Sequence, residues 1–493
     1  MSTDPRENRA PDHAPRLERL FEIVAVEGTF ELQVIDGAVP PHLAGRSYMN
    51  GPAVFERGGV AYRHWLDGDG LITSLQFDGG RAVATHRFVH STKRAEELAA
   101  GRALFRAFGT AFPEDRLRRG FSLESPVNVS VVPWQGRLLA FGEQGLPWEL
   151  DPVTLETRGE FRFGGRLNEV SPLSAHAHPD RESGELVDFG ISYAAAEPIL
   201  HLYRFADGTL AERSRFPLPY ACSTHDFAIS ERFAVVYLSP HLMDVQGFLK
   251  QGKPVNDCLS WRPDLGARLL VIDRRANELL ATIPLAQGYC LHLANAFERR
   301  DDDELIVDLI ELEGPVYDQY TPLPELFPAE PAGGPVRYVV DSEHWEIKDR
   351  RATAYRATPD FPAIDPRRMQ RETHEAWMLG MSAAGKPGRK FFDELVRVRF
   401  DRGEVADRYR SPHGCYLGGE PIFLPDLSLD RPEDRLADRA GFILCQELDP
   451  TGDGPPIVDF LLFDAFSLAM GPIARLRLPH PIPPGFHASW LGA

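Results

Sequence analysis

The sequence has few cysteines, no long uninterrupted apolar run and no dense basic stretch. Its five cysteines form no CxxC pair, and their odd number fits a reduced compartment better than a disulfide framework. The most apolar stretch, residues 457–474, is interrupted by Asp459, Asp464, Gly471 and Pro472, so we expect no membrane-spanning helix.

The first twenty residues are polar and charged, without the apolar segment of a secretory signal, so we expect a cytoplasmic protein. Peripheral contact with a membrane is left open. The net charge of -18 repels phosphate backbones, so nucleic acid is not an expected partner. Hydrophobic residues at 43% and charged residues at 26% indicate an ordinary globular chain that can bury a large core.

Short apolar or alternating runs separated by turn residues predict many β-strands. The clearest of these runs are residues 137–141, 186–193, 269–273, 305–310 and 441–446. Residues 91–108 are rich in Ala, Leu, Glu and Arg, which predicts one helix with Ser91 as its N-cap. Asp67-Gly68-Asp69-Gly70 predicts a hairpin turn between two strands.

Many scattered strands without alternating long helices favour an all-β closed architecture. A length of 493 residues suits a propeller of roughly seventy residues per blade if there are seven blades. An array of β-sandwich domains is the rival, because no internal repeat is visible that would decide for a propeller.

Four of the sixteen histidines stand out because each adjoins a strand-like run. They are His176, His225, His292 and His487, and they are separated by 49, 67 and 195 residues. This spacing differs from the few-residue spacing of a zinc finger or a metalloprotease helix. In a propeller, however, the inner strands of successive blades converge on one axis and can bring such distant residues to a common ion.

At this point the residues resemble the carotenoid cleavage oxygenase family, from about Phe30 to the C-terminus. Residues 62–70, YRHWLDGDG, resemble the family's YHWFDGDG segment. Further similar segments follow in the family's order: residues 138–143 (LLAFGE), 150–157 (LDPVTLET), 184–186 (GEL), 225–229 (HDFAI), 292–298 (HLANAFE), 420–425 (EPIFLP) and 485–487 (GFH).

The resemblance implies a seven-bladed β-propeller, with helical and loop insertions forming a cap over an axial iron site. Residues 1–29 would be a partly flexible N-terminal segment and residues 30–493 a single oxygenase domain. The implied Fe(2+) ligands are His176, His225, His292 and His487. The implied outer carboxylates, which hold the second nitrogens of ligand imidazoles, are Glu143, Asp360 and Glu420.

The first ligand has a local alternative, because the sequence reads Ala-His-Ala-His-Pro where the family usually has one His before Pro. Counting back from residues 184–186 selects His176, and His178 is then a loop residue.

Two positions depart from the family's pattern. Asp360 stands where relatives have Glu, and the lost methylene shortens its reach by roughly 1.3 Å, so it needs a backbone shift or a bridging water. Val129 replaces a Thr that faces the open coordination region, which puts the shape of the oxygen site in doubt.

The resemblance implies that dioxygen cleaves a conjugated double bond into two carbonyl products. Carotenoids or apocarotenoids, stilbenes or related phenylpropanoids, and retinyl ester isomerisation are the family's three outcomes. Stilbene-cleaving members tend to have a Tyr before Arg-Phe-Val and a Lys before the Ser/Thr-rich strand. This chain has Ala84-Thr85-His86 and Leu123-Glu124-Ser125 there, which favours a polyene held in an apolar tunnel.

Two alternative functions of other classes remain. A β-propeller could serve as a binding scaffold without catalysis, with all four histidines structural. A calcium-dependent propeller hydrolase is the other, although calcium prefers oxygen ligands. Metal analysis separates them, since iron near one per chain decides for the oxygenase. The sequence does not fix the oligomeric state.

Overall fold

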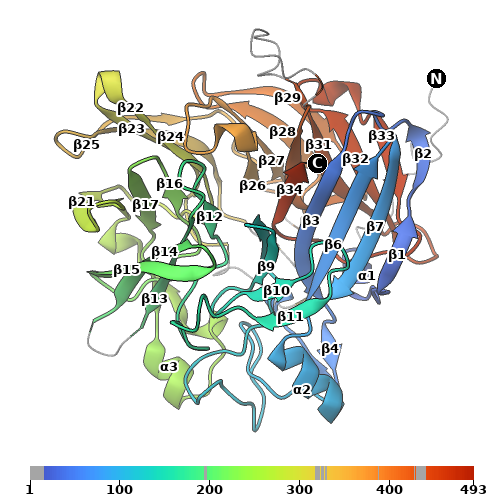
Figure 1. Ribbon diagram of the computed structural model, residues 1–493, viewed down its shortest axis with the longest axis horizontal. Helices are drawn as coiled ribbons and strands as arrows, with labels where there is room; N and C mark the ends of the chain where they lie inside the picture. The colour runs from blue at the N-terminus through green and yellow to red at the C-terminus, as the bar shows by residue number, and fades with distance from the viewer. Residues whose placement is uncertain are drawn as a thin grey trace.

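Seven antiparallel sheets of four or five strands surround one axis in the computed structural model (Figure 1). The structure describes residues 16–193, 197–316, 323, 327, 330–386, 388–426, 428 and 440–492. The sheets are the blades of a propeller, which confirms the predicted all-β fold and its seven blades.

The blades are numbered here in chain order, and their strands are given from the innermost outward. Blade 1 contains β34 (Ala488–Gly492), β3 (Gly45–Ala53), β6 (Asp69–Asp78), β7 (Arg81–Phe88) and β1 (Gly28–Glu31). Blade 2 contains β8 (Ser130–Trp134), β9 (Arg137–Phe141), β10 (Trp148–Leu150) and β11 (Thr157–Glu160). Blade 3 contains β12 (His178–Pro179), β13 (Leu186–Ser192), β14 (Ile199–Ala206) and β15 (Thr209–Pro217).

The remaining four blades follow the same order. Blade 4 contains β16 (Ala228–Ile229), β17 (Phe233–Leu238), β20 (Arg268–Asp273) and β21 (Glu278–Pro284). Blade 5 contains β22 (Leu293–Arg299), β23 (Glu304–Leu312), β24 (Gly333–Asp341) and β25 (Glu346–Ala352). Blade 6 contains β26 (Asp360–Ala363), β27 (Glu375–Gly380), β28 (Glu394–Arg399) and β29 (Glu404–Arg410). Blade 7 contains β30 (Tyr416–Pro425), β31 (Gly441–Asp449), β32 (Ile457–Asp464), β33 (Ala474–Arg477) and β2 (Gln33–Gly37).

The pattern of apolar and polar residues in a strand matches the burial of that strand's position in the blade. β17 reads FAVVYL and is buried at every residue, because both of its faces pack against neighbouring blades. β29, an outer strand, alternates exposed and half-buried residues. All five strand runs expected from the sequence coincide with strands, namely β9, β13, β20, β23 and β31.

Two blades are completed by strands from opposite parts of the chain. β34 pairs with β3 from Met49↔Ala488 to Gly45↔Gly492, so it becomes the innermost strand of blade 1. β2 pairs with β33 and is the outermost strand of blade 7. Figure 1 shows β34 next to the axis and β2 at the rim. The ring of blades is therefore closed by backbone hydrogen bonds at two places.

Helices occur only as short insertions in the described part of the chain. They are α1 (Glu18–Phe21), α2 (Thr92–Ala100) and α3 (Val245–Lys250). The 3-10 turns are η1 (Trp65–Asp67), η2 (Asn256–Cys258), η3 (Pro263–Leu265), η4 (Arg300–Asp302), η6 (Pro366–Arg368) and η9 (Leu468–Met470). Two hairpins lie outside the blades: β4 (Glu56–Arg57) with β5 (Val60–Ala61), and β18 (His241–Met243) with β19 (Leu259–Trp261). Across the residues described, no helix has the length and apolarity needed to cross a membrane.

The expected helix over residues 91–108 is too long. The Ser91 side chain does accept a hydrogen bond from the Arg94 N–H, as an N-cap does. The helix ends at Ala100, because Gly101 adopts a left-handed backbone and its N–H caps the carbonyls of Glu97 and Leu98.

The expected hairpin at residues 67–70 is wrong, because both of its acids have structural partners. Asp67 ends η1, where its buried carboxylate accepts the hydroxyl of Thr110 at 2.7 Å. Asp69 begins β6 and forms a buried ion pair with Lys93 at 3.2 Å. The segment joins η1 to β6 of blade 1, and the chain does not make a hairpin turn there.

Candidate metal centre

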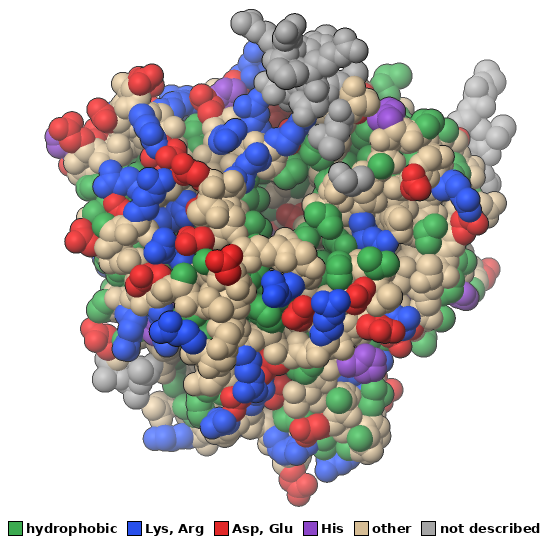
Figure 2. Space-filling model, in the orientation of Figure 1, with side chains coloured by type: hydrophobic (Ala, Val, Ile, Leu, Met, Phe, Trp, Pro, Cys, Tyr) green, Lys and Arg blue, Asp and Glu red, His purple; other side chains and the backbone are tan. Residues whose placement is uncertain are grey.

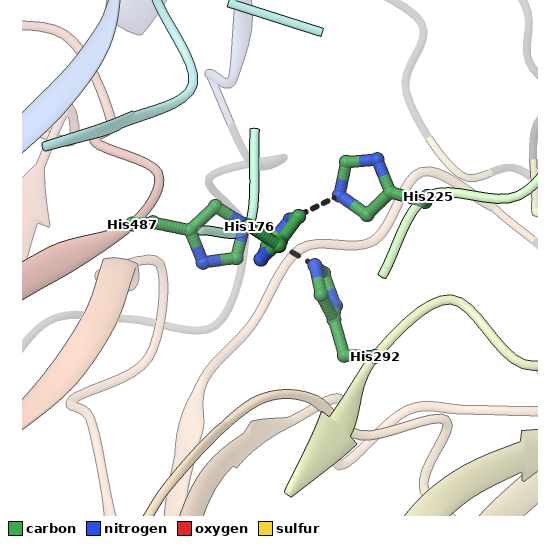
Figure 3. A group of neighbouring side chains, drawn as sticks. All are labelled: His176, His225, His292 and His487. Atoms are coloured by element: carbon green, nitrogen blue, oxygen red, sulfur yellow. Dashed lines mark hydrogen bonds between the residues drawn. The ribbon is translucent and has the colours of Figure 1, made fainter. Parts of the chain in front are cut away.

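The four histidines each lie just before an innermost strand. His176 precedes β12, His225 precedes β16, His292 precedes β22 and His487 precedes β34. Because these strands converge on the axis, blades 3, 4, 5 and 1 bring their histidines together. Figure 3 shows the four rings pointing toward one another.

The nitrogens of these rings lie within bonding range of one ion. His176 Nε2 is 2.8 Å from His225 Nε2, and His292 Nε2 is 3.1 Å from His487 Nε2. All four ligand atoms lie within 4.8 Å of one another. An octahedral ion with metal–nitrogen bonds of about 2.1 Å separates adjacent donors by about 3.0 Å and opposite donors by about 4.2 Å. The donor set therefore has the size of an octahedral site.

Each of three rings has a carboxylate beside its other nitrogen. Glu143 Oε1 is 2.9 Å from His225 Nδ1. Glu420 Oε2 is 3.4 Å from His487 Nδ1. Such an acceptor fixes an imidazole with its proton on Nδ1 and its lone pair on Nε2.

Asp360 reaches the third ring directly, although its side chain is one methylene shorter than Glu. Its Oδ1 is 2.5 Å from His292 Nδ1, so no bridging water is needed. The register of β26 against β27 shifts between Asp360 and Ala363, and Phe361 between them has a positive φ of 55°. The sequence predicts either a backbone shift or a bridging water to offset the missing methylene of Asp360. The irregular backbone is the first of these.

The carboxylates favour a shared proton or a metal ion where the Nε2 atoms meet. If Nδ1 of His225 donates to Glu143, then Nε2 of His225 presents a lone pair toward His176 at 2.8 Å. The same holds for Nε2 of His292, which Asp360 orients toward His487. Facing lone pairs repel one another unless a proton or a metal ion lies between them. The residues present therefore fit a divalent metal ion held by neutral imidazoles.

The electrostatic environment favours the neutral form at two of the four rings, those of His176 and His487. Burial lowers the pKa of His176 well below its usual value, and the neighbouring charges of His487 and His225 lower it further. Burial also lowers the pKa of His487, and Glu420 opposes that shift. At His292 burial lowers the pKa, but the charge and hydrogen bond of Asp360, together with the charges of Asp226 and Glu420, outweigh burial and leave the pKa raised.

His178, the alternative first ligand, lies outside the cluster. Its Nε2–H donates to the backbone carbonyl of Phe227 at 2.8 Å. His178 pairs with Val187 at the start of blade 3, and its ring packs against Phe227. Its side chain is therefore used in holding blade 3 to blade 4.

A further carboxylate at the centre, Asp226, was not among the acids expected from the sequence. It is only 4% exposed, and its Oδ1 lies 3.6 Å from His176 Nδ1. The sequence signal for Asp226 was its place directly after His225, because an acid next to a ligand in the chain also lies near the metal site.

Val129 lies against the backbone of a ligand. Its side chain is buried, and its carbonyl accepts the N–H of His487 at 3.1 Å. The substitution thus places an apolar group at the start of β8, in the same hydrophobic cluster as Phe486.

Two cavities approach the centre. The cap cavity, of about 400 Å³, is lined by Phe108, Phe121, Glu143, Tyr193, Phe248 and Leu249 among others. Its walls come partly from the insertions that contain α2 and α3 and partly from segments of blades 2 and 3, and it reaches Glu143, the partner of His225. The axial cavity, of about 370 Å³, is lined by His176, His292, His487, Asp226 and Glu420 among others.

The family model described as retinal pigment epithelial membrane protein (RPE65) matches residues 21–492. The chain is 28% identical to an apocarotenoid-15,15'-oxygenase of Synechocystis over 484 residues, with 94% of each chain covered. It is 26% identical to an isoeugenol monooxygenase of Pseudomonas putida, again over 94% of each chain. It is 25% identical to resveratrol cleavage oxygenase 1 of Chaetomium globosum, over 99% of this chain and 89% of the relative.

Solved structures give the same result. A single-residue variant of the Synechocystis apocarotenoid oxygenase superposes with a TM-score of 0.84 at 27% identity, over 98% of this chain and 99% of the other. The cobalt-substituted form of that enzyme also gives 0.84, at 26% identity, over 97% and 99%. Sequence and fold agree over nearly the whole chain, and the chain belongs to the RPE65/carotenoid cleavage oxygenase family.

Proposed function

We propose that this chain is an iron(II)-dependent dioxygenase that cleaves one conjugated double bond of an apocarotenoid or carotenoid into two carbonyl products. The observation that carries the proposal is the convergence of one ring nitrogen from each of four histidines within 4.8 Å. The relatives named as apocarotenoid, carotenoid, stilbene and isoeugenol oxygenases support alkene cleavage with dioxygen.

His176, His225, His292 and His487 would hold the metal, with Glu143, Asp360 and Glu420 orienting three of the rings. Iron(II), when bound by these imidazoles, would supply the activation of dioxygen. The reaction joins one alkene and one O₂ and yields two carbonyl groups, so no additional reductant is required.

The protein's own contribution is positioning. The cap cavity brings its substrate to Glu143, beside His225, and its walls of Phe108, Phe121 and Phe248 exclude water from a long apolar molecule. Holding one double bond within about 3 to 3.5 Å of the oxygen determines which bond is cleaved.

A stilbene or phenylpropanoid is the second candidate. The cap cavity also contains Ser122, Ser192, Tyr193 and Thr224, whose hydroxyl groups can bind a phenol. The relatives named for isoeugenol and resveratrol make this alternative concrete.

Peripheral membrane contact is part of the proposal, because a polyene dissolves in lipid. Phe121 is 51% exposed and Leu249 is 41% exposed, and both line the cap cavity. Two apolar side chains at the opening would let the cavity take its substrate from a bilayer surface.

The test is aerobic incubation of the iron-loaded protein with apocarotenals, carotenoids, stilbenes and isoeugenol under ¹⁸O₂, followed by product masses. We expect one label in each of two carbonyl fragments of an apocarotenoid. Turnover of stilbenes alone would decide for the second candidate. A protein that holds iron near one per chain yet cleaves no alkene would overturn the proposal.

A further inference from the structure

Asp226 contacts three of the four segments that contain the candidate ligands. It directly follows His225 in the chain. Its Oδ2 accepts the N–H of Leu293, the residue after His292, at 2.8 Å. Its Oδ1 lies 3.6 Å from Nδ1 of His176. One carboxylate thus joins blades 3, 4 and 5 at the level of the metal centre.

Both oxygens of Asp226 act as acceptors. Besides the bond to Leu293, Oδ1 accepts the N–H of Phe227 at 2.7 Å. A carboxyl group whose two oxygens both accept backbone N–H bonds is held in its ionised form. Asp226 therefore places a fixed negative charge that is 4% exposed beside the ring of His176.

His178 is the other ring near this charge. Its Nε2 is 3.8 Å from Asp226 Oδ1 and already donates to the carbonyl of Phe227. His176 has no such donation from Nδ1 to a carbonyl or carboxylate at hydrogen-bond distance among the described residues. Its backbone N–H is fixed separately by Ser174 Oγ at 3.0 Å.

We propose that Asp226 is the positioning residue of His176, the one candidate ligand that Glu143, Asp360 and Glu420 do not contact. At 3.6 Å the contact is longer than a hydrogen bond, so Asp226 acts through its charge. The carboxylate attracts the Nδ1–H edge of the ring and so turns Nε2 toward the other three histidines. Its bond to Leu293 sets the position of His292 at the same time.

The consequence is an outer shell of four carboxylates around a divalent ion. The inference rests on the proposed metal site and adds to it a residue that controls the geometry of two ligands from neighbouring blades. Removing the charge should therefore disturb the metal's coordination even where the fold is kept.

The test compares the full-length wild type with Asp226→Asn, loaded with cobalt(II) and, separately, with iron(II). The visible spectrum of cobalt reports the ligand geometry, and competition with a chelator gives the metal affinity. Asp180→Asn is the matched control, because Asp180 is also 4% exposed and bonds backbone N–H groups of Glu182 and Ser183 without contacting a ligand.

We expect Asp226→Asn to shift the cobalt spectrum and to weaken iron binding by about 10- to 100-fold. Asp180→Asn should lower the melting temperature and leave both metal readouts unchanged. A wild-type spectrum and affinity in Asp226→Asn would overturn the inference, whatever its melting temperature. If the wild type itself binds neither metal, the proposed function fails instead.

Should Asp226→Asn not fold, Asp226→Glu decides. It keeps the charge and both acceptor oxygens but moves them by one methylene relative to His176. We expect a shifted cobalt spectrum together with weaker iron binding than in the wild type. A spectrum and affinity identical to wild type would show that the position of the charge does not matter, and would also overturn the inference.

Discussion

At the scale of single residues, the candidate ligands differ in what fixes their second nitrogen. His225, His292 and His487 face Glu143, Asp360 and Glu420, whereas His176 faces only the more distant Asp226. These acids belong to different blades. The histidines come from blades 1, 3, 4 and 5 and the three orienting acids from blades 2, 6 and 7, so every blade supplies one group.

The assignment within the Ala-His-Ala-His-Pro segment is tested by two alanine variants. His176→Ala should lower iron from about one per chain to near zero and abolish turnover, because it removes a donor from the converging set. His178→Ala should keep its iron and lose the contacts of this ring with Phe227 and Asp226. Metal analysis and turnover measure both, and an inactive His178→Ala beside an active His176→Ala would reverse the assignment.

Asp360 offers a test of the shortened carboxylate. Asp360→Asn should weaken iron binding by about 10- to 100-fold, because an amide is a poorer acceptor for the Nδ1–H of His292. Asp360→Glu should lower turnover, since the backbone already places Oδ1 at 2.5 Å and a longer side chain would be overpacked. Unchanged iron content and turnover in both variants would mean that Asp360 does not serve the site.

Asp188 predicts a pH dependence of stability. It is fully buried, and burial raises its pKa from 3.8 to about 7. Between about pH 4 and pH 7 the folded protein keeps this proton while the unfolded chain has lost it, so stability falls as the pH rises through that window.

Asp188→Asn removes this titration. The melting temperature of the variant minus that of the wild type should therefore increase from about pH 5 to about pH 7 and then level off. Thermal scans of both proteins in the same metal state measure it. A difference that stays constant over this range would show that Asp188 is ionised throughout.

At the scale of elements, α3 and the loop that contains Phe121 both contribute to the lining of the cap cavity. Leu249→Glu should weaken binding to neutral lipid vesicles by about 10- to 100-fold, because one buried leucine contributes about 1.5–3 kcal/mol. Vesicle flotation is the measurement. Met470→Glu is the control, since Met470 is 86% exposed but lies on η9, away from the cavity lining.

The strands could be predicted well from the sequence because their alternation and apolar runs are local properties. The helix over residues 91–108 was predicted too long, since its composition hid the effect of Gly101 on the backbone. The turn at residues 67–70 was wrong because Asp67 and Asp69 bond partners far along the chain, and no local pattern contains that information.

At the site, too, local sequence motifs could be recognised but contacts between distant segments could not. The four histidines followed from resemblance to ordered family motifs, and three of the acids with them. Asp226 was missed because its contacts to His176 and Leu293 arise only when three blades meet. The boundary between residues 1–29 and the domain stays a prediction, although Leu17 and Leu20 are buried in the core.

At the scale of the whole molecule, the propeller is closed by β34 on the inside of blade 1 and by β2 on the outside of blade 7. Figure 2 shows acidic and basic side chains interspersed over the face viewed in Figure 1, so no extended field of one sign covers it. We expect the metal centre to depend on the inner closing strand, β34, because His487 directly precedes it.

A chain that ends at His487 tests this closure. Without β34, blade 1 loses the strand that pairs with β3, so we expect a melting temperature lower by several degrees and loss of most of the iron. Deleting β2 removes a strand exposed along its whole length and should lower the melting temperature while iron is retained. Iron analysis beside thermal scans distinguishes the two, and full iron retention without β34 would contradict the expectation.

The position of His487 also sets the order of events during biosynthesis. The ribosome makes all seven blades' worth of chain before it reaches this last candidate ligand, and β34 must then insert beside β3, which was made more than four hundred residues earlier. A nascent or stalled chain therefore cannot assemble the four-nitrogen set. Metal binding by all four nitrogens therefore follows the pairing of β34 with β3, and a tightly held ion would report that the ring has closed.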